Sequence, residues 1–434
     1  MSRADVVVIG GGLAGLAAAA YLGRAGRRVL VLEKAGALGG RAATLQKDGF
    51  SLNLGPHALY LGGAGAQVLG ELGVHPVGGR PVVSGAHALA GGVLHTLPGG
   101  FLSLLTTGLF GLAAKIEAAR VLSRLPHLDP APLDRVPVAT WLGRSISEPP
   151  VRRFLEALLR LSTYSGDMQR LSAGAALRQF QVAQQGVLYL DGGWQRLVDD
   201  LRGVVAAAGV EIRTGARAAA IELEGGAVRA VRLVDGGRLE ADAAVVAASP
   251  AAARALVPDN PALAAAAARA LPVHAACLDV ALSALPRPKS VFALGVDRPL
   301  YASVHSAVAR VAPAGGATLH LAKYQPSPED PADEGELERL LDQLQPGFRD
   351  RVITRRFLPS LIVSHALVTA EGGGLSGRPD VAVPGARGLF LAGDWVGPEG
   401  MLADASLASA RRAAKQIAAR PADAPAVEPR RSAA

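Results

Sequence analysis

Short apolar runs alternate along the chain with longer segments whose apolar residues recur at helical spacing. The run DVVVIG, at residues 5–10, is rich in β-branched residues and ends in glycine, which predicts a fully buried parallel strand. Residues 13–24 predict a helix of mostly small residues, and Gly26 ends it. RRVLVLE, at residues 27–33, predicts a second strand. Together these elements predict a strand–helix–strand unit at the start of the chain.

The same kind of pattern returns in the middle and near the end of the chain. A Gly-Gly turn precedes a predicted amphipathic helix at 194–208 and a strand at 210–213. EADAAVVAASP, at residues 240–250, predicts a buried strand that ends in a turn. GLFLAGDW, from residue 388, predicts another buried strand, and residues 402–418 predict a helix. These segments are expected to complete the sheet that the first unit begins.

Two intervening stretches have a different character. Residues 77–188 read as mostly helical, with periodic apolar positions at 151–161. Residues 271–370 contain β-like runs at 276–282 and 318–324, interrupted by prolines. The predicted fold class is therefore α/β, with a parallel-sheet domain interleaved with an α+β domain. The predicted boundaries give the first domain residues 1–76, 189–270 and 371–420 and the second residues 77–188 and 271–370, with a disordered tail at 421–434.

Composition sets limits on the partners. The chain has 434 residues, of which 50% are hydrophobic, so it can form two or three domains with a large core. The net charge of +8 suggests an anionic partner, yet only six of the 45 basic residues are lysines and no basic run exceeds two residues. Aromatic residues, at 4%, do not interleave with basic ones. The sequence therefore does not predict nucleic-acid binding.

The single cysteine, Cys277, allows no intramolecular disulfide, which fits a reducing compartment. No cluster of cysteine and histidine has zinc-ligand spacing, so no metal site is predicted. The first residues lack the pattern of a secretory signal peptide. We therefore expect a cytoplasmic protein.

One segment raises the question of membrane contact. Residues 81–114 contain no Asp, Glu, Lys or Arg, and within them Leu97–Ala114 is a mostly apolar stretch of 18 residues. That length is at the lower limit for a membrane span, and four glycines and two threonines weaken such a reading. The segment predicts a buried or interfacial helix. Peripheral contact with the inner membrane surface, or an entrance for an apolar substrate, remains as the alternative.

The glycine-rich turn after the first strand carries the clearest chemistry. Residues 10–15, GGGLAG, fit the pattern G-x-G-x-x-G between a strand and a helix. Gly10 permits the tight turn, Gly12 lets a pyrophosphate approach the backbone, and Gly15 lets the helix pack on the strand. Glu33 follows the second strand, 18 residues after Gly15, where an acid binds the adenosine ribose and repels a 2′-phosphate. These residues predict a cofactor with an unphosphorylated ADP group, FAD or NAD.

A second glycine pair distinguishes these two cofactors. Gly39, Gly40 and Arg41 offer another close backbone approach and one cation for the pyrophosphate. This string resembles the GG motif of the flavoprotein superfamily that contains amine oxidases, phytoene desaturases and protoporphyrinogen oxidase. The resemblance extends over nearly the whole chain and implies a GR2-type flavoprotein fold with an FAD cofactor. In this fold a Rossmann-like FAD-binding domain is interleaved with an α+β substrate-binding domain.

The resemblance also implies which other segments contact FAD. The loop after FSLNL, with Gly55, Pro56 and His57, corresponds to the loop that reaches the flavin ring. Residues Ala216–Ala218 correspond to the segment that touches the adenine, and Gly393 and Asp394 to the pair at the ribityl chain. The helix from Leu402 is expected to aim its N-terminus at the flavin. The full predicted FAD site comprises Gly10, Gly12, Leu13, Ala14, Gly15, Glu33, Lys34, Gly40, Arg41, Gly55, Pro56, His57, Ala216, Arg217, Ala218, Gly393, Asp394, Met401 and Leu402.

FAD is expected to be held without a covalent bond. In relatives with a cysteinyl linkage the cysteine lies in the C-terminal flavin segment, whereas Cys277 lies far upstream in the predicted substrate domain.

Candidates for catalysis are few, because a flavin performs the electron transfer and the protein mainly positions the substrate. His57 and Tyr60 lie in the loop that resembles the flavin-adjacent one and could orient a substrate or move a proton. Tyr324, Trp395 and Met401 are predicted to line the substrate pocket. Lys323 could serve the flavin through a water, but the alternation of TLHLAKY favours a lysine at the surface.

The sequence leaves several reactions open. The ending AGDW…LADASLASARRAA resembles phytoene desaturase-related proteins, and Met401 and Leu402 lie where many amine oxidases place an aromatic wall. A desaturase or dehydrogenase of a small apolar substrate is therefore the first hypothesis. A flavin amine oxidase that uses oxygen is the second, a protoporphyrinogen-oxidase-like enzyme the third, and a non-enzymatic FAD-binding scaffold the last.

Overall fold

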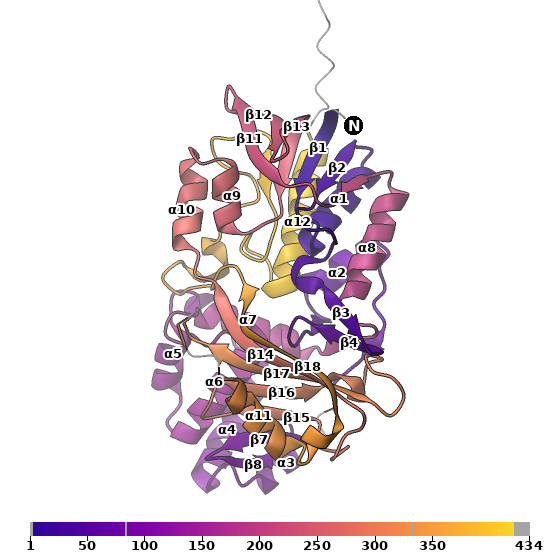
Figure 1. Ribbon diagram of the computed structural model, residues 1–434. Helices are drawn as coiled ribbons and strands as arrows, with labels where there is room; N and C mark the ends of the chain where they lie inside the picture. Colours follow the sequence, from indigo (N-terminus) through magenta and orange to yellow (C-terminus); the bar gives the residue numbers. More distant parts are fainter. Residues whose placement is uncertain (1–2, 83–84, 328, 331–332, 421–434) are drawn as a thin grey trace, which may run out of the picture.

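The computed structural model describes residues 3–82, 85–327, 329–330 and 333–420 of the chain. Two seven-stranded sheets lie toward opposite ends of an elongated molecule (Figure 1). The predicted tail at 421–434 lies outside the described residues.

The first sheet is built around the predicted strand–helix–strand unit. Its order is β10-β2-β1-β13-β12-β11, with β19 also paired to β13. The strands β10, β2, β1, β13 and β19 are parallel, as the fully apolar runs predict, and β11 and β12 add an antiparallel hairpin. The strand bounds are β1 Arg3–Ile9, β2 Val29–Leu32, β10 Glu211–Arg213, β11 Ala218–Glu224, β12 Ala227–Leu233, β13 Arg238–Val246 and β19 Leu389–Leu391.

Helices with small side chains cover this sheet closely. α1 (Leu13–Arg24) packs against both α8 (Gln195–Ala207) and α12 (Leu402–Ala418). The alanines at 17–20 are fully buried, and such short side chains let the neighbouring helices approach. α2 (Ala64–Glu71) packs on α12, and α9 (Pro250–Leu256) and α10 (Pro261–Arg269) lie together beside β11.

The second sheet has the order β18-β14-β17-β16-β15-β7-β8. All its pairings are antiparallel except that of β15 with β7. Leucines on α11 (Glu334–Leu344) pack into the core of this sheet. The bounds are β7 Ala86–Ala90, β8 Val93–Thr96, β14 Val273–Leu282, β15 Phe292–Gly295, β16 Leu300–Val304, β17 Ala317–Gln325 and β18 Val352–Ser364.

A group of helices forms a separate hydrophobic core. Its buried residues pack with Ala88 of β7 and with Val296 after β15, so this core lies next to that end of the second sheet. Its helices are α3 Phe101–Thr106, α4 Leu112–Arg124, α5 Val138–Ser145, α6 Pro149–Thr163 and α7 Ala173–Gln184.

Short elements lie between the two main sheets. They are the hairpin β3 (Thr44–Lys47) and β4 (Phe50–Asn53) and the small sheet of β5 (Leu59–Tyr60), β9 (Val187–Leu190) and β6 (Gly78–Gly79). The 3₁₀ turns are η1 Gly40–Ala42, η2 Leu125–His127, η3 Ala131–Leu133, η4 His305–Ala307, η5 Phe348–Arg351 and η6 Gly374–Gly377.

Each sheet draws its strands from separated parts of the chain, so the predicted interleaving of an α/β domain with an α+β domain is confirmed. One detail was not predicted. The stretch at 77–188, expected to be mostly helical, contains α3 to α7 and also supplies β7 and β8 to the second sheet. These strands are short and lie in a charge-free segment, where periodicity does not separate strand from helix.

The expectation of one helix at Leu97–Ala114 is wrong. The segment contains α3 and the start of α4, separated at residues 107–111. Thr107 leaves the helical conformation, and its hydroxyl donates to Thr96 O at 2.7 Å and accepts from Leu109 N at 3.2 Å. Gly108 and Gly111 flank this turn and weaken a continuous helix. Among the described residues, no helix is both long and apolar enough to cross a bilayer.

Candidate active site

A large cavity lies between the first sheet and the second. Its volume is about 870 Å³, and residues from both domains line it. The segments after β1, β2, β13 and β19 all reach it, so the carboxyl edge of the parallel strands forms one end. This is the position at which open α/β sheets bind ligands.

The glycine loop presents bare backbone to this cavity. Gly12 is the N-cap of α1, and no side chain caps the helix there, so its first N–H groups are available to an anion. Gly10 has φ of 116°, which side-chain-bearing residues rarely adopt. A Cβ on Gly15 would lie 1.8 Å from Gly10 O, so only glycine permits this packing. Gly10 and Gly12 line the cavity, whereas Gly15 supports the turn from behind.

Glu33 holds the nucleotide end of the cavity in shape. Its carboxylate accepts N–H bonds from Gly11 at 2.7 Å and from Ala35 at 2.8 Å. Ala216 N donates to Glu33 O at 2.9 Å, which brings the segment after β10 to the same place. Glu33, Lys34 and Ala216–Ala218 therefore lie together at the cavity wall, as expected for an adenosine site.

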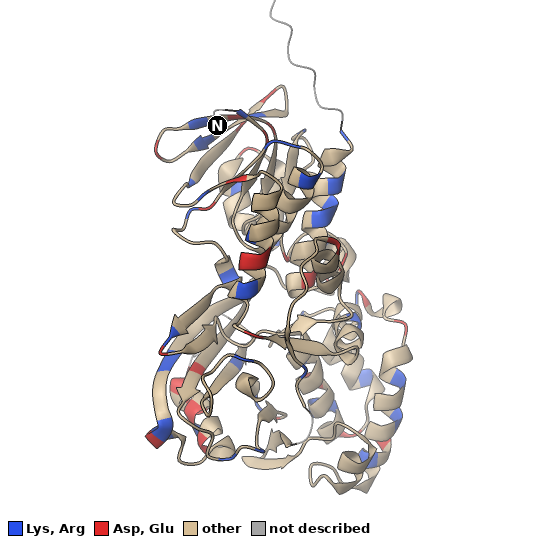
Figure 2. Ribbon diagram, turned by 90° about the vertical axis from the view of Figure 1, so that its right-hand side faces the viewer, with Lys and Arg blue, Asp and Glu red and all other residues tan. Residues whose placement is uncertain are grey.

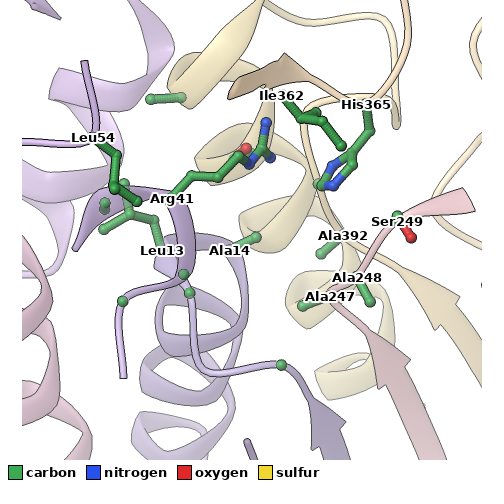
Figure 3. Close-up of a pocket in the computed structure, with 18 of the residues that line it drawn as sticks. Leu13, Ala14, Arg41, Leu54, Ala247, Ala248, Ser249, Ile362, His365 and Ala392 are labelled. Atoms are coloured by element: carbon green, nitrogen blue, oxygen red, sulfur yellow. The ribbon is translucent and has the colours of Figure 1, made fainter. Parts of the chain in front are cut away.

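Arg41 crosses the middle of the cavity. Figure 3 shows it extending above the start of α1 toward Ile362 and His365. Its Nη1 donates to Val363 O at 2.8 Å and to Asp394 Oδ2 at 2.7 Å. The N-terminal GG segment is thereby tied to β18 and to the loop after β19, and Arg41 and the start of α1 line the same cavity.

Asp394 acts inside the protein rather than on the cavity surface. It accepts from Arg41 and also from the backbone N–H and the Nδ1 of His365, both at 3.0 Å. Burial raises the pKa of a carboxyl, but the Arg41 charge and these hydrogen bonds hold the pKa of Asp394 well below its usual value. Asp394 therefore remains an anion that positions Arg41 and His365.

His57 is fixed by main-chain carbonyls on both sides. Its Nδ1 lies 3.0 Å from Gly55 O and its Nε2 lies 3.2 Å from Arg41 O. The ring also packs against Trp194, with 4.8 Å between centroids. Burial lowers the pKa of His57 to about 4, so the imidazole is neutral near pH 7. This geometry gives His57 a positioning function between two loops, because the one N–H of the neutral ring donates to a main-chain carbonyl and the other nitrogen also faces a carbonyl oxygen.

Tyr60 lines the cavity but donates its hydroxyl to Ser162 O at 2.8 Å. Burial raises the pKa of this phenol above its usual value, so it stays protonated. The hydrogen bond connects β5 to α6 and leaves the aromatic ring as the part of Tyr60 that a ligand can contact.

An apolar chamber forms the other end of the cavity. We use this term for Tyr164, Ala275, Cys277, Ala322, Leu361, Val363 and Leu402, which line the cavity and pack in one cluster. They come from the end of α6, from β14, β17 and β18, and from the start of α12. Burial raises the pKa of the Cys277 thiol well above its usual value, so this side chain is a small apolar group here.

The start of α12 also borders the cavity, through Leu402, Ala403, Asp404 and Ser406. No side chain caps this helix. Asp404 is buried, and its Oδ1 accepts from Gly65 N at 2.9 Å, at the start of α2. Burial raises the pKa of Asp404 to about 6, although the Gly65 hydrogen bond opposes the shift.

Most predicted site residues line the cavity. They are Gly10, Gly12, Leu13, Ala14, Glu33, Lys34, Gly40, Arg41, Pro56, His57, Tyr60, Ala216, Arg217, Ala218, Gly393 and Leu402. Six do not contribute to its wall: Gly15, Gly55, Asp394, Met401, Tyr324 and Trp395.

The three predicted pocket residues are the main correction. Trp395 is fully buried in the core of the first domain, and its Nε1 donates to Ala248 O at 2.9 Å. Met401 packs with Ala175, Val368 and Leu375, away from the cavity. Tyr324 lies behind the wall and packs edge-on against Tyr164, with 6.1 Å between centroids. Long-range packing set these positions, which local sequence does not encode.

Lys323 is also directed away from the cavity. Its Nζ lies 3.4 Å from Asp330 Oδ2 and 3.3 Å from Glu336 Oε2, on the α11 side of β17. The expectation of a surface lysine is only partly correct, because the side chain is 12% exposed.

Sequence reasoning missed Tyr164, Leu361, Val363, His365 and Asp404. The first four belong to no motif: Tyr164 ends α6, whereas Leu361 and Val363 lie on β18 and His365 follows it, so only the packing of distant segments brings them to one cavity. Asp404 did carry a signal, since it is an acid in the first turn of a helix predicted to face the flavin.

Comparison with known proteins agrees with this geometry. The profile of the family described as flavin containing amine oxidoreductase matches residues 13–418, nearly the whole chain. The chain belongs to this family. It is therefore a flavin-dependent oxidoreductase with the fold that the glycine motifs predict.

Individual relatives match shorter parts. A carotenoid 3,4-desaturase of Haloarcula japonica is 54% identical over 56 residues, which are 13% of this chain and 11% of the relative. A coproporphyrinogen III oxidase of Propionibacterium freudenreichii is 31% identical over 193 residues, 41% of this chain and 34% of the relative. The matches thus span between a tenth and a third of these relatives.

A solved oxidoreductase from Methanosarcina mazei is similar over the full fold. Its TM-score is 0.73 at 19% identity, and the match covers 95% of this chain and all of that one. At that identity the likeness concerns the fold.

The described residues suit a flavin dinucleotide. Uncapped N–H groups at α1 and the cation of Arg41 fit a pyrophosphate, and Glu33 fits a ribose. When bound there, a flavin supplies a two-electron acceptor, and the protein supplies its orientation and surroundings.

Proposed function

We propose that this chain is a non-covalent FAD enzyme that dehydrogenates an apolar substrate, in the manner of a phytoene desaturase. The observation that carries the proposal is the apolar chamber. Its walls are aliphatic and aromatic side chains and one thiol that stays protonated. An apolar chain loses water contact when it enters such a chamber, whereas a charged substrate would lose its hydration without compensation.

The placement of charge in the cavity supports an apolar substrate. Five ionisable Asp, Glu, Lys or Arg residues are in its described lining: Glu33, Lys34, Arg41, Arg217 and Asp404. Glu33, Lys34 and Arg217 belong to the nucleotide end, and Arg41 is bonded to Asp394. Asp404 lies next to the chamber, and so does Arg41, which donates to Val363 O at 2.8 Å and is paired with Asp394. Within the described lining, the substrate end therefore offers no unpaired cation for the carboxylates of a porphyrinogen.

Removal of two hydrogens from neighbouring carbons needs an acceptor for a hydride and a site for a proton. His57 and Tyr60 are both bonded to main-chain carbonyls, so they hold loops in place. Asp404, with a pKa raised to about 6, is the carboxyl near the chamber that could take the proton. The partly buried side chains of Leu361, Val363 and Leu402 give the reacting carbon an apolar wall that limits contact with water.

The Cys277 thiol bears on the mode of FAD attachment. Its position far upstream of the C-terminal flavin segment predicts no covalent link to FAD, and its side chain lines the cavity. We still propose non-covalent FAD, because a thiol whose pKa is raised by burial is a poor nucleophile. Protein denatured in acid should release all its yellow colour to the supernatant; colour retained in the pellet would refute this.

Anaerobic flavin reduction by chosen substrates tests the proposal. We would follow the visible flavin absorbance of the purified holoenzyme with detergent-dispersed isoprenoids and polyenes, with primary and secondary amines, and with a porphyrinogen. We expect an isoprenoid or polyene to bleach the flavin. Bleaching by amines alone, or by the porphyrinogen alone, would reject the apolar-substrate proposal.

An amine oxidase is the second candidate, favoured by the rings of Tyr60 and Tyr164 in the cavity wall. Two aromatic faces could hold a neutral amine beside a flavin. Leu402 weighs against it, because an aliphatic side chain stands where many amine oxidases have an aromatic wall. The amine arm of the same experiment decides between the two.

A further inference from the structure

A cluster of exposed apolar side chains lies at the end of the molecule farthest from the first sheet (Figure 1). Phe101, Leu102 and Leu105 on α3 are 73%, 76% and 50% exposed, and Leu112 and Ile116 on α4 are 77% and 64% exposed. We call these five residues the apolar tip. Soluble proteins rarely expose several large apolar side chains on consecutive short helices, so the tip points to a binding surface.

The helices are held in place by their other faces. Leu104 of α3 and Ala114 and Ala118 of α4 are buried in the helical core, together with Phe110 from the turn between them. Other residues of the same helices therefore fill that core, and the exposed side chains are not part of it. They project outward from a packed support.

Charge next to the apolar tip favours one kind of partner. α4 carries a row of exposed residues at the four-residue spacing of a helix. Leu112 and Ile116 come first in this row, and Arg120 and Arg124 follow. The lowest ribbon in Figure 2 is mostly tan, and Lys and Arg segments lie on helices above it. The apolar side chains thus lie at the start of α4, and the arginines follow one or two turns later. This order matches a membrane surface, where acyl chains lie beneath anionic headgroups.

The acidic residue within α4 does not oppose this arrangement. Glu117 accepts from Ser147 N at 2.8 Å and Glu148 N at 2.7 Å, so its carboxylate is turned toward the loop before α6. From residue 81 to 128 it is the sole Asp or Glu, against Lys115, Arg120 and Arg124.

We propose that the apolar tip docks the protein on an anionic membrane surface, with Arg120 and Arg124 at the headgroups. The contact is peripheral, since no described helix is long and apolar enough to cross a bilayer. This inference is independent of the reaction that the cavity performs.

Vesicle binding tests it with the FAD-loaded full chain. We would measure co-sedimentation with vesicles of phosphatidylcholine alone and with added phosphatidylglycerol, for wild type and for Leu102→Gln/Leu112→Gln. Ile353→Gln is the matched control, because Ile353 is a half-exposed aliphatic residue on β18, outside the tip. Flavin absorbance and the melting temperature show that each variant is folded.

We expect wild type and Ile353→Gln to bind the anionic vesicles and the double variant to bind them at least about tenfold more weakly. Arg120→Gln/Arg124→Gln should lower binding to anionic vesicles and remove its sensitivity to salt. The proposal is overturned if wild type binds no better than the double variant. It is also overturned if the tip instead mediates self-association without lipid that Leu102→Gln/Leu112→Gln abolishes.

A second variant reports insertion directly. The native tryptophans Trp141, Trp194 and Trp395 are all buried. Phe101→Trp therefore places a new exposed fluorophore at the tip, and its emission should shift to shorter wavelength and be quenched by brominated lipid. Unchanged emission with anionic vesicles would contradict the proposal.

Discussion

Single residues determine how the nucleotide end of the cavity is built. Glu33 both shapes the glycine loop, through Gly11 and Ala35, and faces the expected ribose. Asp394 holds Arg41 and His365 without lining the cavity. Glu33 thus faces the expected ligand directly, whereas Asp394 positions Arg41 and His365, which line the cavity.

Glu33→Arg should weaken FAD binding by on the order of 2–4 kcal/mol, because ribose and loop hydrogen bonds are lost and the charge is inverted. The dissociation constant, from quenching of flavin fluorescence on reconstitution, measures this. Glu240→Arg is the control, since Glu240 is exposed on β13. Unchanged FAD affinity of Glu33→Arg would reject the ribose assignment.

Asp404 should make stability depend on pH. Burial raises its pKa to about 6 in the folded protein, so the folded state holds a proton that the unfolded chain has already lost. The contribution of Asp404 to stability is then greatest below pH 4, falls as the pH rises to about 6 and is constant above it, a loss of roughly 2–3 kcal/mol.

Asp404→Asn keeps an oxygen for Gly65 N but cannot ionise. Its free energy of unfolding should exceed that of wild type near pH 8 and approach it near pH 4, measured in urea. A difference that does not change with pH would show that Asp404 does not titrate as proposed.

Leu402 and Met401 should respond differently to the same substitution. Leu402→Asp places a carboxylate in the chamber, so it should impair substrate oxidation while FAD remains bound. Met401→Asp buries a charge in a small core cluster and should lower the melting temperature instead. Full activity of Leu402→Asp on an apolar substrate would remove Leu402 from the pocket.

At the scale of elements, a buried ionic network connects three strands of the second sheet to the hairpin of β3 and β4. Asp279 on β14 is fully buried and accepts from His320 Nδ1 on β17 and from Arg356 Nη2 on β18, each at 2.6 Å. Arg356 also donates to Asn53 O at the end of β4. Cys277 and Ala275, on the same strand β14, line the chamber.

Asp279→Ala leaves Arg356 and His320 without their shared acceptor and should destabilise the fold by about 3–5 kcal/mol. Asp279→Asn retains an acceptor and should cost less. Chemical denaturation of the holoprotein distinguishes them, and equal stability of wild type and Asp279→Ala would contradict the role of this network.

Elements with strong local signals were predictable from the sequence. The bounds of α1 and α12 agree with the predicted helices 13–24 and 402–418, because small or amphipathic patterns and glycine boundaries are local features. The break at Thr107 was not predicted, because it depends on a hydrogen bond to Thr96 in another element. β7 and β8 were missed for a similar reason, since β7 pairs with the distant strand β15 and β8 joins the sheet through β7.

At the scale of the whole molecule, the cavity exists because two domains meet. The residues at its nucleotide end belong to short sequence motifs, such as the glycine loop at 10–15, and could be found there. The chamber combines α6, β14, β17, β18 and α12, which no local pattern brings together. The cofactor class was therefore readable from the sequence, whereas the pocket residues Tyr324, Trp395 and Met401 were misassigned.

The central claim is that this flavin oxidoreductase removes two hydrogens from an apolar substrate. The most direct test is a single anaerobic turnover of the holoenzyme with the isoprenoid that bleaches it, with flavin absorbance and product mass measured together. We predict one product that has lost two hydrogens for each flavin reduced. A flavin that is reduced without that product, or that no apolar substrate reduces, would contradict the account.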